Sequence, residues 1–306
     1  MIGQIPEGCQ PRLGKGQEGG QTVQVVGVVG GGLMGAGIAF TIASKLNCKV
    51  ILREVSTEAV SGARQRVEGL VQRAVRKGTP SAEADAWLGR VQCTTDLAEL
   101  ATADLVVEAV FENLDLKRQV FADLDRLLPP PRLLCSNTSG ISISMIAGAT
   151  QHPERVIGTH FFNPAPVMKL VEVVTGLATN QTTIDLARSF CHALGKETIL
   201  VKDFPGFVVT RVGQAMLCEA VRCLEQGVAS AGDIDRGMRL GYNYPLGPLE
   251  LIDLIGVDTE LQVMQSLFDE LGETFRPSPL MKAMVASGQL GRKSGRGFYA
   301  YQQGER

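Results

Sequence analysis

A single stretch near the N-terminus restricts the possible folds of this chain more than any other: an apolar run that leads directly into a glycine-rich turn. Residues 25–29 read Val-Val-Gly-Val-Val and are followed by Gly30, Gly32 and Gly35 in the spacing G-x-G-x-x-G. A second apolar run then ends at Glu54, nineteen residues after the third glycine. Strand, turn, helix, strand and acid in this order are typical of a dinucleotide-binding βαβ unit.

Each part of this unit has a physical task. One glycine makes the tight turn, another lets the backbone approach a pyrophosphate, and the third lets helix and strand pack closely. The N-terminus of the helix faces the phosphates, and the acid accepts hydrogen bonds from the adenosine ribose. We therefore predict that a dinucleotide is held by the turn and the acid, through Gly30, Gly32, Leu33, Met34, Gly35 and Glu54.

Two alternatives bear on this unit. Residues 25–43 are nearly all apolar and contain the G-x-x-x-G pair Gly31 and Gly35, a pattern that membrane helices also show. Glycines in the middle of the run break such a helix, which favours the cofactor site. The carboxylate of Glu54 predicts NAD, because it binds free ribose hydroxyls and repels a 2′-phosphate. Arg53 is adjacent, however, and is a candidate partner for the 2′-phosphate of NADP.

Composition narrows the class of protein. The chain has 306 residues, of which 44% are hydrophobic, enough for a large core and two domains. Its net charge of −2 argues against a nucleic-acid partner. Seven scattered cysteines without a C-x-x-C pair indicate a reducing compartment and no structural metal. Residues 1–22 lack an apolar core typical of a secretory signal, and we expect a disordered extension on a cytoplasmic protein without a membrane span.

The order of apolar and polar segments predicts the organisation of the domains. Strand and helix signals alternate in the first half, which favours an α/β fold with a Rossmann-type, doubly wound parallel sheet. The expected strands there are 23–29, 50–53, 105–109 and 133–136, and the expected helices are 34–46, 58–76, 82–88 and 114–128. Pro205-Gly206 breaks the chain, and the remainder has helical patterns. We predict an extension over 1–22, a nucleotide-binding domain over 23–204 and an all-helical domain over 205–306.

Among three histidines, His160 is the best catalytic candidate. It ends a predicted strand, 155–161, just before a proline-rich loop, and Glu172 lies on the next predicted strand, 169–174. If the two strands are neighbours, the carboxylate can hold one ring nitrogen and raise the basicity of the other. A structural histidine in the core is the alternative interpretation.

A second group of polar residues follows the strand that ends near residue 136. Ser136, Asn137, Thr138 and Ser139 are consecutive, and ligands of open α/β sheets bind beyond the carboxyl ends of the strands. These side chains are suited to a nicotinamide and a substrate oxygen. A helix N-cap or a solvated turn is the alternative.

At this point the chain resembles the L-3-hydroxyacyl-CoA dehydrogenases, and within them the short-chain bacterial 3-hydroxybutyryl-CoA branch. The matching motifs run in order and cover nearly the whole chain after residue 22. They are GGGLMGAGIA (30–39), VEAVFENLDLK (107–117), SNTS (136–139), HFFNPAPVMKLVEV (160–173), DFPGFVVTR (203–211), YPLGPLELIDLIGVDT (244–259) and LGRKSGRGFY (290–299).

The resemblance implies hydride transfer between C3 of an acyl-CoA and the nicotinamide of NAD. It makes His160 the general base that removes the proton of the 3-hydroxyl, and Glu172 the carboxylate that holds the imidazole. Ser139 then hydrogen-bonds the reacting oxygen.

The same resemblance assigns binding residues. Asn137 lies in a matching motif, and Asn163 is expected in the substrate and nicotinamide pocket. Positions that contact NAD in the family are occupied by Glu112, Lys117 and Lys293. Lys77 matches a position that contacts CoA, and Arg73 and Arg76 are near enough to serve its phosphates. Without the resemblance, a solvated helix face is the favoured interpretation of this basic cluster.

One position departs from the family pattern. The family has Asn in the P-G-F-x-V-N-R motif, in its active-site group, and this chain has Thr210. Threonine keeps a hydroxyl donor but loses the second donor of the amide and its reach. We expect a weaker hold on the substrate carbonyl and place Thr210 with the catalytic residues.

Three functions are therefore compared. The leading one is an NAD-dependent 3-hydroxyacyl-CoA dehydrogenase, which by resemblance pairs through its helical domain as a homodimer. The second keeps the fold but acts on a free hydroxy acid, as in the gulonate dehydrogenase and crystallin branch. The third is a nucleotide-binding protein of low turnover, which Thr210 supports but Ser139, His160 and Glu172 together oppose.

Overall fold

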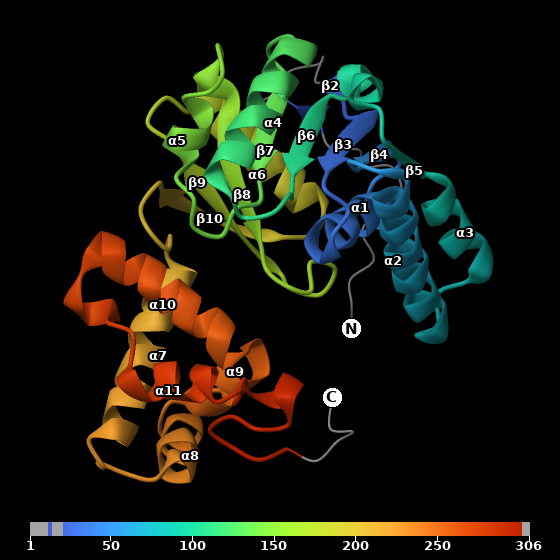
Figure 1. Ribbon diagram of the computed structural model, residues 1–306. Helices are drawn as coiled ribbons and strands as arrows, with labels where there is room; N and C mark the ends of the chain where they lie inside the picture. The colour runs from blue at the N-terminus through green and yellow to red at the C-terminus, as the bar shows by residue number, and fades with distance from the viewer. Residues whose placement is uncertain (1–11, 14–20, 302–306) are drawn as a thin grey trace. The chain divides into compact units, whose positions relative to one another are not determined.

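The computed structural model describes residues 12–13 and 21–301 and separates into two compact units, one ending at Phe207 and one beginning at Val208 (Figure 1). The extension predicted for residues 1–22 falls mostly outside the described residues. Within it, β1 (Arg12–Leu13) and β2 (Gln21–Thr22) form an antiparallel pair.

An eight-stranded sheet forms the centre of the first unit, in the spatial order β10-β9-β8-β7-β6-β3-β4-β5. Strands β3 to β8 are all parallel, whereas β9 and β10 run in the opposite direction. The carboxyl ends of β3 to β8 therefore share one edge, where ligands of such sheets bind. The strands are β3 (Val25–Val29), β4 (Lys49–Arg53), β5 (Val91–Thr94), β6 (Leu105–Glu108), β7 (Leu133–Ser136), β8 (Val156–Phe161), β9 (Leu170–Thr175) and β10 (Glu197–Lys202).

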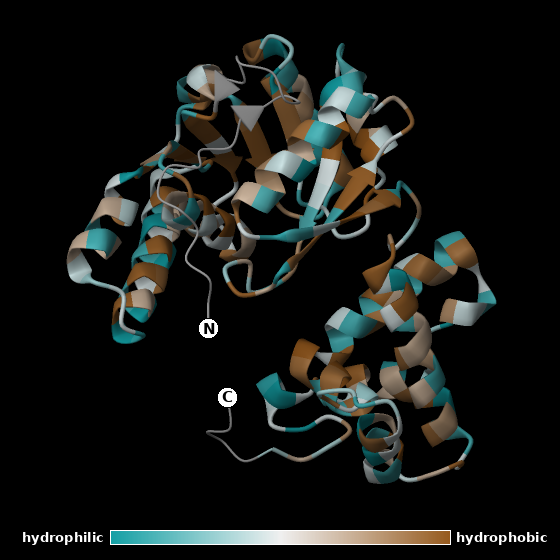
Figure 2. Ribbon diagram, turned by 180° about the vertical axis from the view of Figure 1, so that it is seen from behind, coloured by the Kyte–Doolittle hydropathy of each residue, from teal (hydrophilic) through white to brown (hydrophobic). Residues whose placement is uncertain are grey.

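Helices cover both faces of the sheet, and the strands are apolar on both sides for that reason. In β6, Leu105 and Val107 belong to one core and Val106 to the other. The first core includes residues of α1 and α6, and the second includes residues of α4 and α5. Figure 2 shows the resulting apolar colouring of the strands. The helices are α1 (Leu33–Lys45), α2 (Thr57–Arg76), α3 (Ser81–Gly89), α4 (Leu114–Leu127), α5 (Ile143–Ala147) and α6 (Gln181–Ala193).

Most elements expected from the sequence are present, with small shifts at their ends. The segment after Asp96 is the 3-10 helix Leu97–Thr102, whose start is capped by the Asp96 side chain, which accepts a hydrogen bond from the N–H of Ala98. The strand β5 and the helix α5 were not predicted. β5 is an edge strand with no fully buried residue, and α5 has only five residues, so neither has a clear apolar pattern.

The second unit is helical, as predicted. It comprises α7 (Val209–Glu225), α8 (Ala231–Gly241), α9 (Pro248–Ile255), α10 (Val257–Leu271) and α11 (Pro279–Ala286). Leu217, Val221, Ile252 and Met264 are among the residues of its apolar core. Across residues 12–13 and 21–301, none of the helices has both the length and the apolar character needed to cross a membrane.

Candidate active site

The glycine-rich turn between β3 and α1 has the steric properties expected of it. Gly30 has a φ of 95°, and a Cβ there would lie 2.6 Å from the carbonyl oxygen of Ala109. A Cβ on Gly35 would lie 1.7 Å from the carbonyl oxygen of Gly30. By contrast, a Cβ on Gly32 would meet no atom within 4 Å. Gly30 and Gly35 are therefore required by the protein's own packing, while Gly32 leaves the backbone open to a ligand.

The start of α1 is also open. Gly32 is its N-cap and supplies no side-chain cap, so the first N–H groups of the helix are available to an anion. Leu33 follows with 69% of its surface exposed, and Met34 is half-buried. An uncapped helix start beside an open glycine fits the pyrophosphate of a dinucleotide.

Glu54 lies at the same edge, directly after β4. Its carboxylate accepts hydrogen bonds from the N–H of Gly31 at 2.5 Å and from the N–H of Val55 at 3.1 Å. Arg53 extends to the neighbouring strand instead, where its Nε donates to the carbonyl oxygen of Thr95 at 3.4 Å. The carboxylate lies beside the turn, where the ribose hydroxyls of NAD are expected, and its role in binding them stays a prediction.

His160 and Glu172 are brought together by the antiparallel pairing of β8 with β9, in which they are directly opposite. The imidazole Nδ1 and a carboxylate oxygen of Glu172 are 2.8 Å apart, with 6% and 0% of the residues exposed. The rings of Phe162 and Phe207 lie 4.5 Å and 5.9 Å from the imidazole, between centroids. A buried carboxylate that holds Nδ1 leaves Nε2 for a reacting group, which is the arrangement of an oriented general base.

The turn after β7 carries the SNTS residues. Thr138 Oγ1 donates to a carboxylate oxygen of Glu112 at 2.5 Å, and the N–H of Ser139 donates to the same oxygen at 2.9 Å. Asn137 accepts a hydrogen bond from the N–H of Phe161 at 2.9 Å through its side-chain oxygen. The turn is thereby fixed to the end of β8, next to His160, and Ser139 is exposed.

Glu108 ends β6, is completely buried and was not among the predicted site residues. Its carboxylate accepts hydrogen bonds at 2.7 Å from Lys117 Nζ, from Ser136 Oγ and from the N–H of Val110. Lys117 is also buried and lies 3.3 Å from the carboxylate of Glu112. The sequence signal was present, because an acid at the end of a fully apolar strand needs a cationic partner.

The loop after His160 is held by a buried lysine that was not among the predicted site residues. Asn163 is exposed on this loop. Lys196 is 6% exposed and donates to the carbonyl oxygens of Ala165 at 2.6 Å and Met168 at 2.7 Å. Burial lowers the pKa of the Lys196 ammonium. The two carbonyls tie the loop to the segment after α6.

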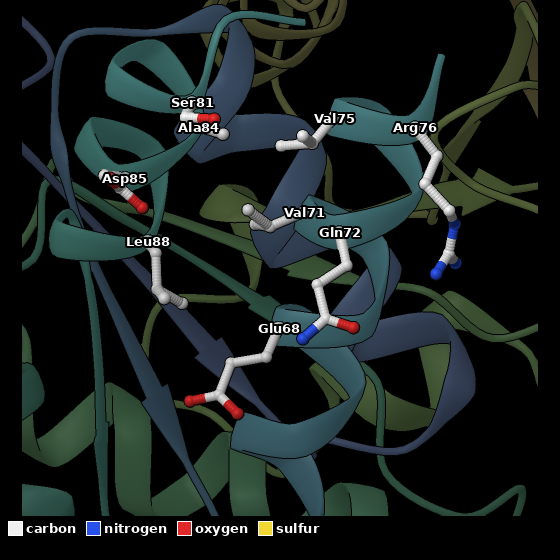
Figure 3. A pocket seen from close by; sticks show the side chains of 9 residues that line it. All are labelled: Glu68, Val71, Gln72, Val75, Arg76, Ser81, Ala84, Asp85 and Leu88. Atoms are coloured by element: carbon white, nitrogen blue, oxygen red, sulfur yellow. The ribbon is translucent and has the colours of Figure 1, made fainter. Parts of the chain in front are cut away.

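The basic cluster lies at the exposed end of α2. Arg73 and Lys77 are both exposed, and Lys77 is the C-cap of the helix. Beside it, α2 and α3 line a groove of about 490 Å³ (Figure 3). Its lining combines the apolar side chains of Val71, Val75, Ala84 and Leu88 with Glu68, Gln72, Arg76, Ser81 and Asp85.

Two candidate residues belong to the second unit. Lys293 is 2.5 Å from a carboxylate oxygen of Asp258. Thr210 is half-buried in the first turn of α7. Their assignments to NAD and to substrate remain predictions. In the described ranges, 12–13 and 21–301, no three His, Cys, Asp or Glu side chains form a group that could hold a metal ion.

Comparison with known proteins identifies the family. Residues 25–204 match the model of the 3-hydroxyacyl-CoA dehydrogenase NAD binding domain, and residues 206–301 match that of the C-terminal domain. A Bacillus subtilis protein named "Probable 3-hydroxybutyryl-CoA dehydrogenase" is 43% identical over 283 residues, which are 92% of this chain and 98% of that protein. The 3-hydroxybutyryl-CoA dehydrogenase of Bradyrhizobium diazoefficiens is 41% identical over 281 residues, 91% of this chain and 96% of its own.

A solved structure agrees with the sequence comparisons. The (S)-3-hydroxybutyryl-CoA dehydrogenase of Ralstonia eutropha superposes with a TM-score of 0.88 at 42% identity, covering 92% of this chain and all of that one. Both domain models, the long alignments and the shared fold agree. The chain therefore belongs to the 3-hydroxyacyl-CoA dehydrogenase family and is an NAD-dependent dehydrogenase of that family.

Proposed function

We propose that this enzyme oxidises short (S)-3-hydroxyacyl-CoA thioesters, with 3-hydroxybutyryl-CoA as the characteristic substrate, to the 3-oxoacyl-CoA. The observation that carries the proposal is the buried pair of His160 and Glu172 at the ligand-binding edge of an NAD-binding sheet. The substrate class is supported by the relatives in Bradyrhizobium and Ralstonia, which are named 3-hydroxybutyryl-CoA dehydrogenases.

In this proposal His160 moves the proton. Its Nε2 takes the proton of the 3-hydroxyl while C3 gives up its hydride and the C3–O bond becomes a carbonyl. The bound NAD⁺ supplies the hydride acceptor at C4 of its nicotinamide. Glu172 keeps the imidazole in the orientation that exposes Nε2 and stabilises the imidazolium that forms, because its carboxylate lies 2.8 Å from Nδ1. Ser139 donates its hydroxyl to the reacting oxygen.

Further residues complete the site. Asn137 and Asn163 contact the nicotinamide and the substrate, with Glu112, Lys117 and Lys293 on the cofactor side. Lys77 and Arg73 bind the phosphates of CoA, for which their exposure at the end of α2 suits them. Thr210 stands in the active-site group in place of the family asparagine.

The same proposal includes a homodimer formed through the helical unit. The supporting observation is a set of large apolar side chains exposed on this unit, including Leu240, Tyr242 and Leu254, at 75%, 72% and 52%. Light scattering of the purified protein is the test, and a monomer at all concentrations would contradict it.

The deciding experiment follows NADH oxidation with acetoacetyl-CoA, with acetoacetate and NADPH as controls. Rapid turnover that requires both NADH and the CoA moiety is the expected result. Equal turnover with acetoacetate would favour a free hydroxy acid as substrate. NADH binding without turnover on either compound would favour a protein with a non-catalytic role.

A further inference from the structure

The glycine-rich turn has a second charged neighbour besides Glu54. Arg66 belongs to α2, yet its Nη1 donates to the carbonyl oxygen of Gly31 at 3.3 Å. The N–H of the same Gly31 donates to Glu54 at 2.5 Å. Gly31 therefore contacts a carboxylate, that of Glu54, through its N–H and a guanidinium, that of Arg66, through its carbonyl oxygen. Both charges lie at the end of the site where the adenosine ribose is expected.

Local structure explains how the guanidinium reaches the turn. Side chains of a helix lean toward its N-terminus, so Arg66 extends along the preceding turn of α2. That turn carries Gly62, and a Cβ there would lie 3.1 Å from Arg66 Nη1. The missing side chain leaves the path open. Ala63, the next residue of α2, packs directly against the glycine-rich turn. A Cβ on Gly31 would lie only 2.3 Å from the Cβ of Ala63.

The neighbouring arginines are engaged elsewhere. Arg64 Nε donates to the carboxylate of Glu68 at 3.0 Å, one turn further along α2. Arg53, adjacent to Glu54 in sequence, donates to the carbonyl oxygen of Thr95. In the described part of the chain, no carboxylate forms an ion pair with Arg66. Among the described residues its hydrogen bond is to the carbonyl oxygen of Gly31, which leaves its positive charge and its remaining N–H donors for a ligand.

We propose that Arg66 is a specificity residue that binds the 2′-phosphate of an adenosine cofactor and so gives this NAD enzyme a measurable affinity for NADP. Glu54 favours the free ribose hydroxyls and repels the phosphate. A guanidinium beside the same turn offsets that repulsion, because its planar set of donors matches phosphate oxygens. The ratio of NAD to NADP affinity is then set by the opposed charges of Glu54 and Arg66. The inference rests on the nucleotide site and is independent of the acyl-CoA substrate.

The test measures nucleotide binding without any substrate. NADH and NADPH are titrated by fluorescence into the full-length parent, Arg66→Ala and the matched control Arg64→Ala. The control removes the same charge from the same helix at a side chain that faces Glu68. We expect Arg66→Ala to weaken NADPH roughly tenfold or more and NADH less than about threefold, because one hydrogen bond to a charged group is lost only with NADPH.

Salt supplies a second readout. The parent and Arg66→Ala should differ less in their affinity for NADPH as ionic strength rises. Salt screens the attraction between an exposed guanidinium and a phosphate. Three results would overturn the proposal: an unchanged NADH to NADPH ratio, an equal loss for both nucleotides, or the same shift in Arg64→Ala. Thermal unfolding of each variant without nucleotide verifies that the exposed substitution leaves the fold intact.

Discussion

Lys117 Nζ and the carboxylate of Glu108 lie 2.7 Å apart, and neither side chain has more than 1% of its surface exposed. This buried ion pair joins the end of β6 to the first turn of α4 and, through Ser136 Oγ, to the end of β7. Lys117 Nζ is also 3.3 Å from the carboxylate of Glu112, which accepts hydrogen bonds from Thr138 and Ser139 of the SNTS turn. The position of Ser139 thus depends on a pair of charges that are themselves withdrawn from solvent.

Lys117→Met should destabilise the enzyme by about 3 kcal/mol or more, because it leaves the Glu108 carboxylate buried without its cation. Urea unfolding in the absence of NAD is the measurement. Lys49→Met, on an exposed side chain at the start of β4, should change stability by less than about 0.5 kcal/mol. If both variants unfold at the same urea concentration, Lys117 serves only as a ligand for the cofactor.

His160→Ala and Glu172→Gln should each lower kcat by roughly 10²- to 10⁴-fold while NADH binding is retained, because proton transfer loses its base or the base loses its orienting carboxylate. Stopped-flow reduction of acetoacetyl-CoA measures this. His192→Ala is the control, since this exposed imidazole bonds to Thr198 at 3.1 Å. Full activity of Glu172→Gln would mean that the hydrogen bond alone, without the negative charge, is sufficient.

Gly35→Ala and Gly32→Ala should separate folding from cofactor binding. A Cβ at Gly35 would overlap the carbonyl oxygen of Gly30, so this variant should lose about 3 kcal/mol or more. Gly32 has open space around it, so Gly32→Ala should cost within about 1 kcal/mol.

For NADH binding, in contrast to stability, Gly32→Ala should be the more harmful of the two substitutions. Gly32→Ala should weaken NADH binding roughly tenfold or more, about 1.4 kcal/mol, because the new methyl group occupies the approach to the pyrophosphate. Unfolding curves and NADH titrations of the two variants provide both numbers. Unaltered NADH affinity in Gly32→Ala would place the pyrophosphate elsewhere.

Thr210→Asn should raise kcat/KM with acetoacetyl-CoA by about tenfold, because an amide restores a second donor that strengthens as charge develops on the substrate carbonyl. Steady-state kinetics with NADH is the measurement. Val212→Asn, an exposed position on the same helix, controls for the amide itself. No gain at position 210 would show that the site has been rebuilt around threonine.

Glu260→Gln should make the enzyme more stable than its parent at pH 8. At pH 5 this gain in stability should be smaller. Glu260 is 3% exposed on α10, its carboxylate accepts a hydrogen bond from Gln214 Nε2, and burial raises its pKa. A raised pKa means that the folded state binds more protons, so the parent loses stability as pH rises from the unfolded pKa through the folded one. The neutral glutamine avoids that loss.

Urea midpoints at several pH values test this expectation. Glu219→Gln, an exposed carboxylate paired with Arg222, should instead follow the parent over the whole range. Parallel curves for Glu260→Gln and the parent would show that the buried carboxylate has the same pKa in the folded and unfolded states.

Local patterns were sufficient to predict several parts of this protein. The spacing of Gly30, Gly32 and Gly35 before Glu54 predicted a βαβ unit, because strand, turn, helix and acid follow one another within 30 residues of the chain. Alternating strand and helix signals predicted the layered first unit, and a succession of helical patterns without strand signals predicted the second. The strand β5 was not predicted because, unlike the equally short β6 and β7, it has no fully buried residue, and α5 was not predicted because a helical period cannot be recognised over five residues.

The tertiary structure decided what the strands bring together. The reversal of β9 places Glu172 opposite His160, and a parallel neighbour would have given another register. Pairing of β6 with β7 joins Glu108 to Ser136, and the fold of α4 carries Lys117 to both. Contact between α2 and the glycine turn brings Arg66 to Gly31, 35 residues away in sequence. Local sequence determines which backbone conformations are favourable, but partners distant in the chain meet only where packing of the two apolar faces sets strand order and direction.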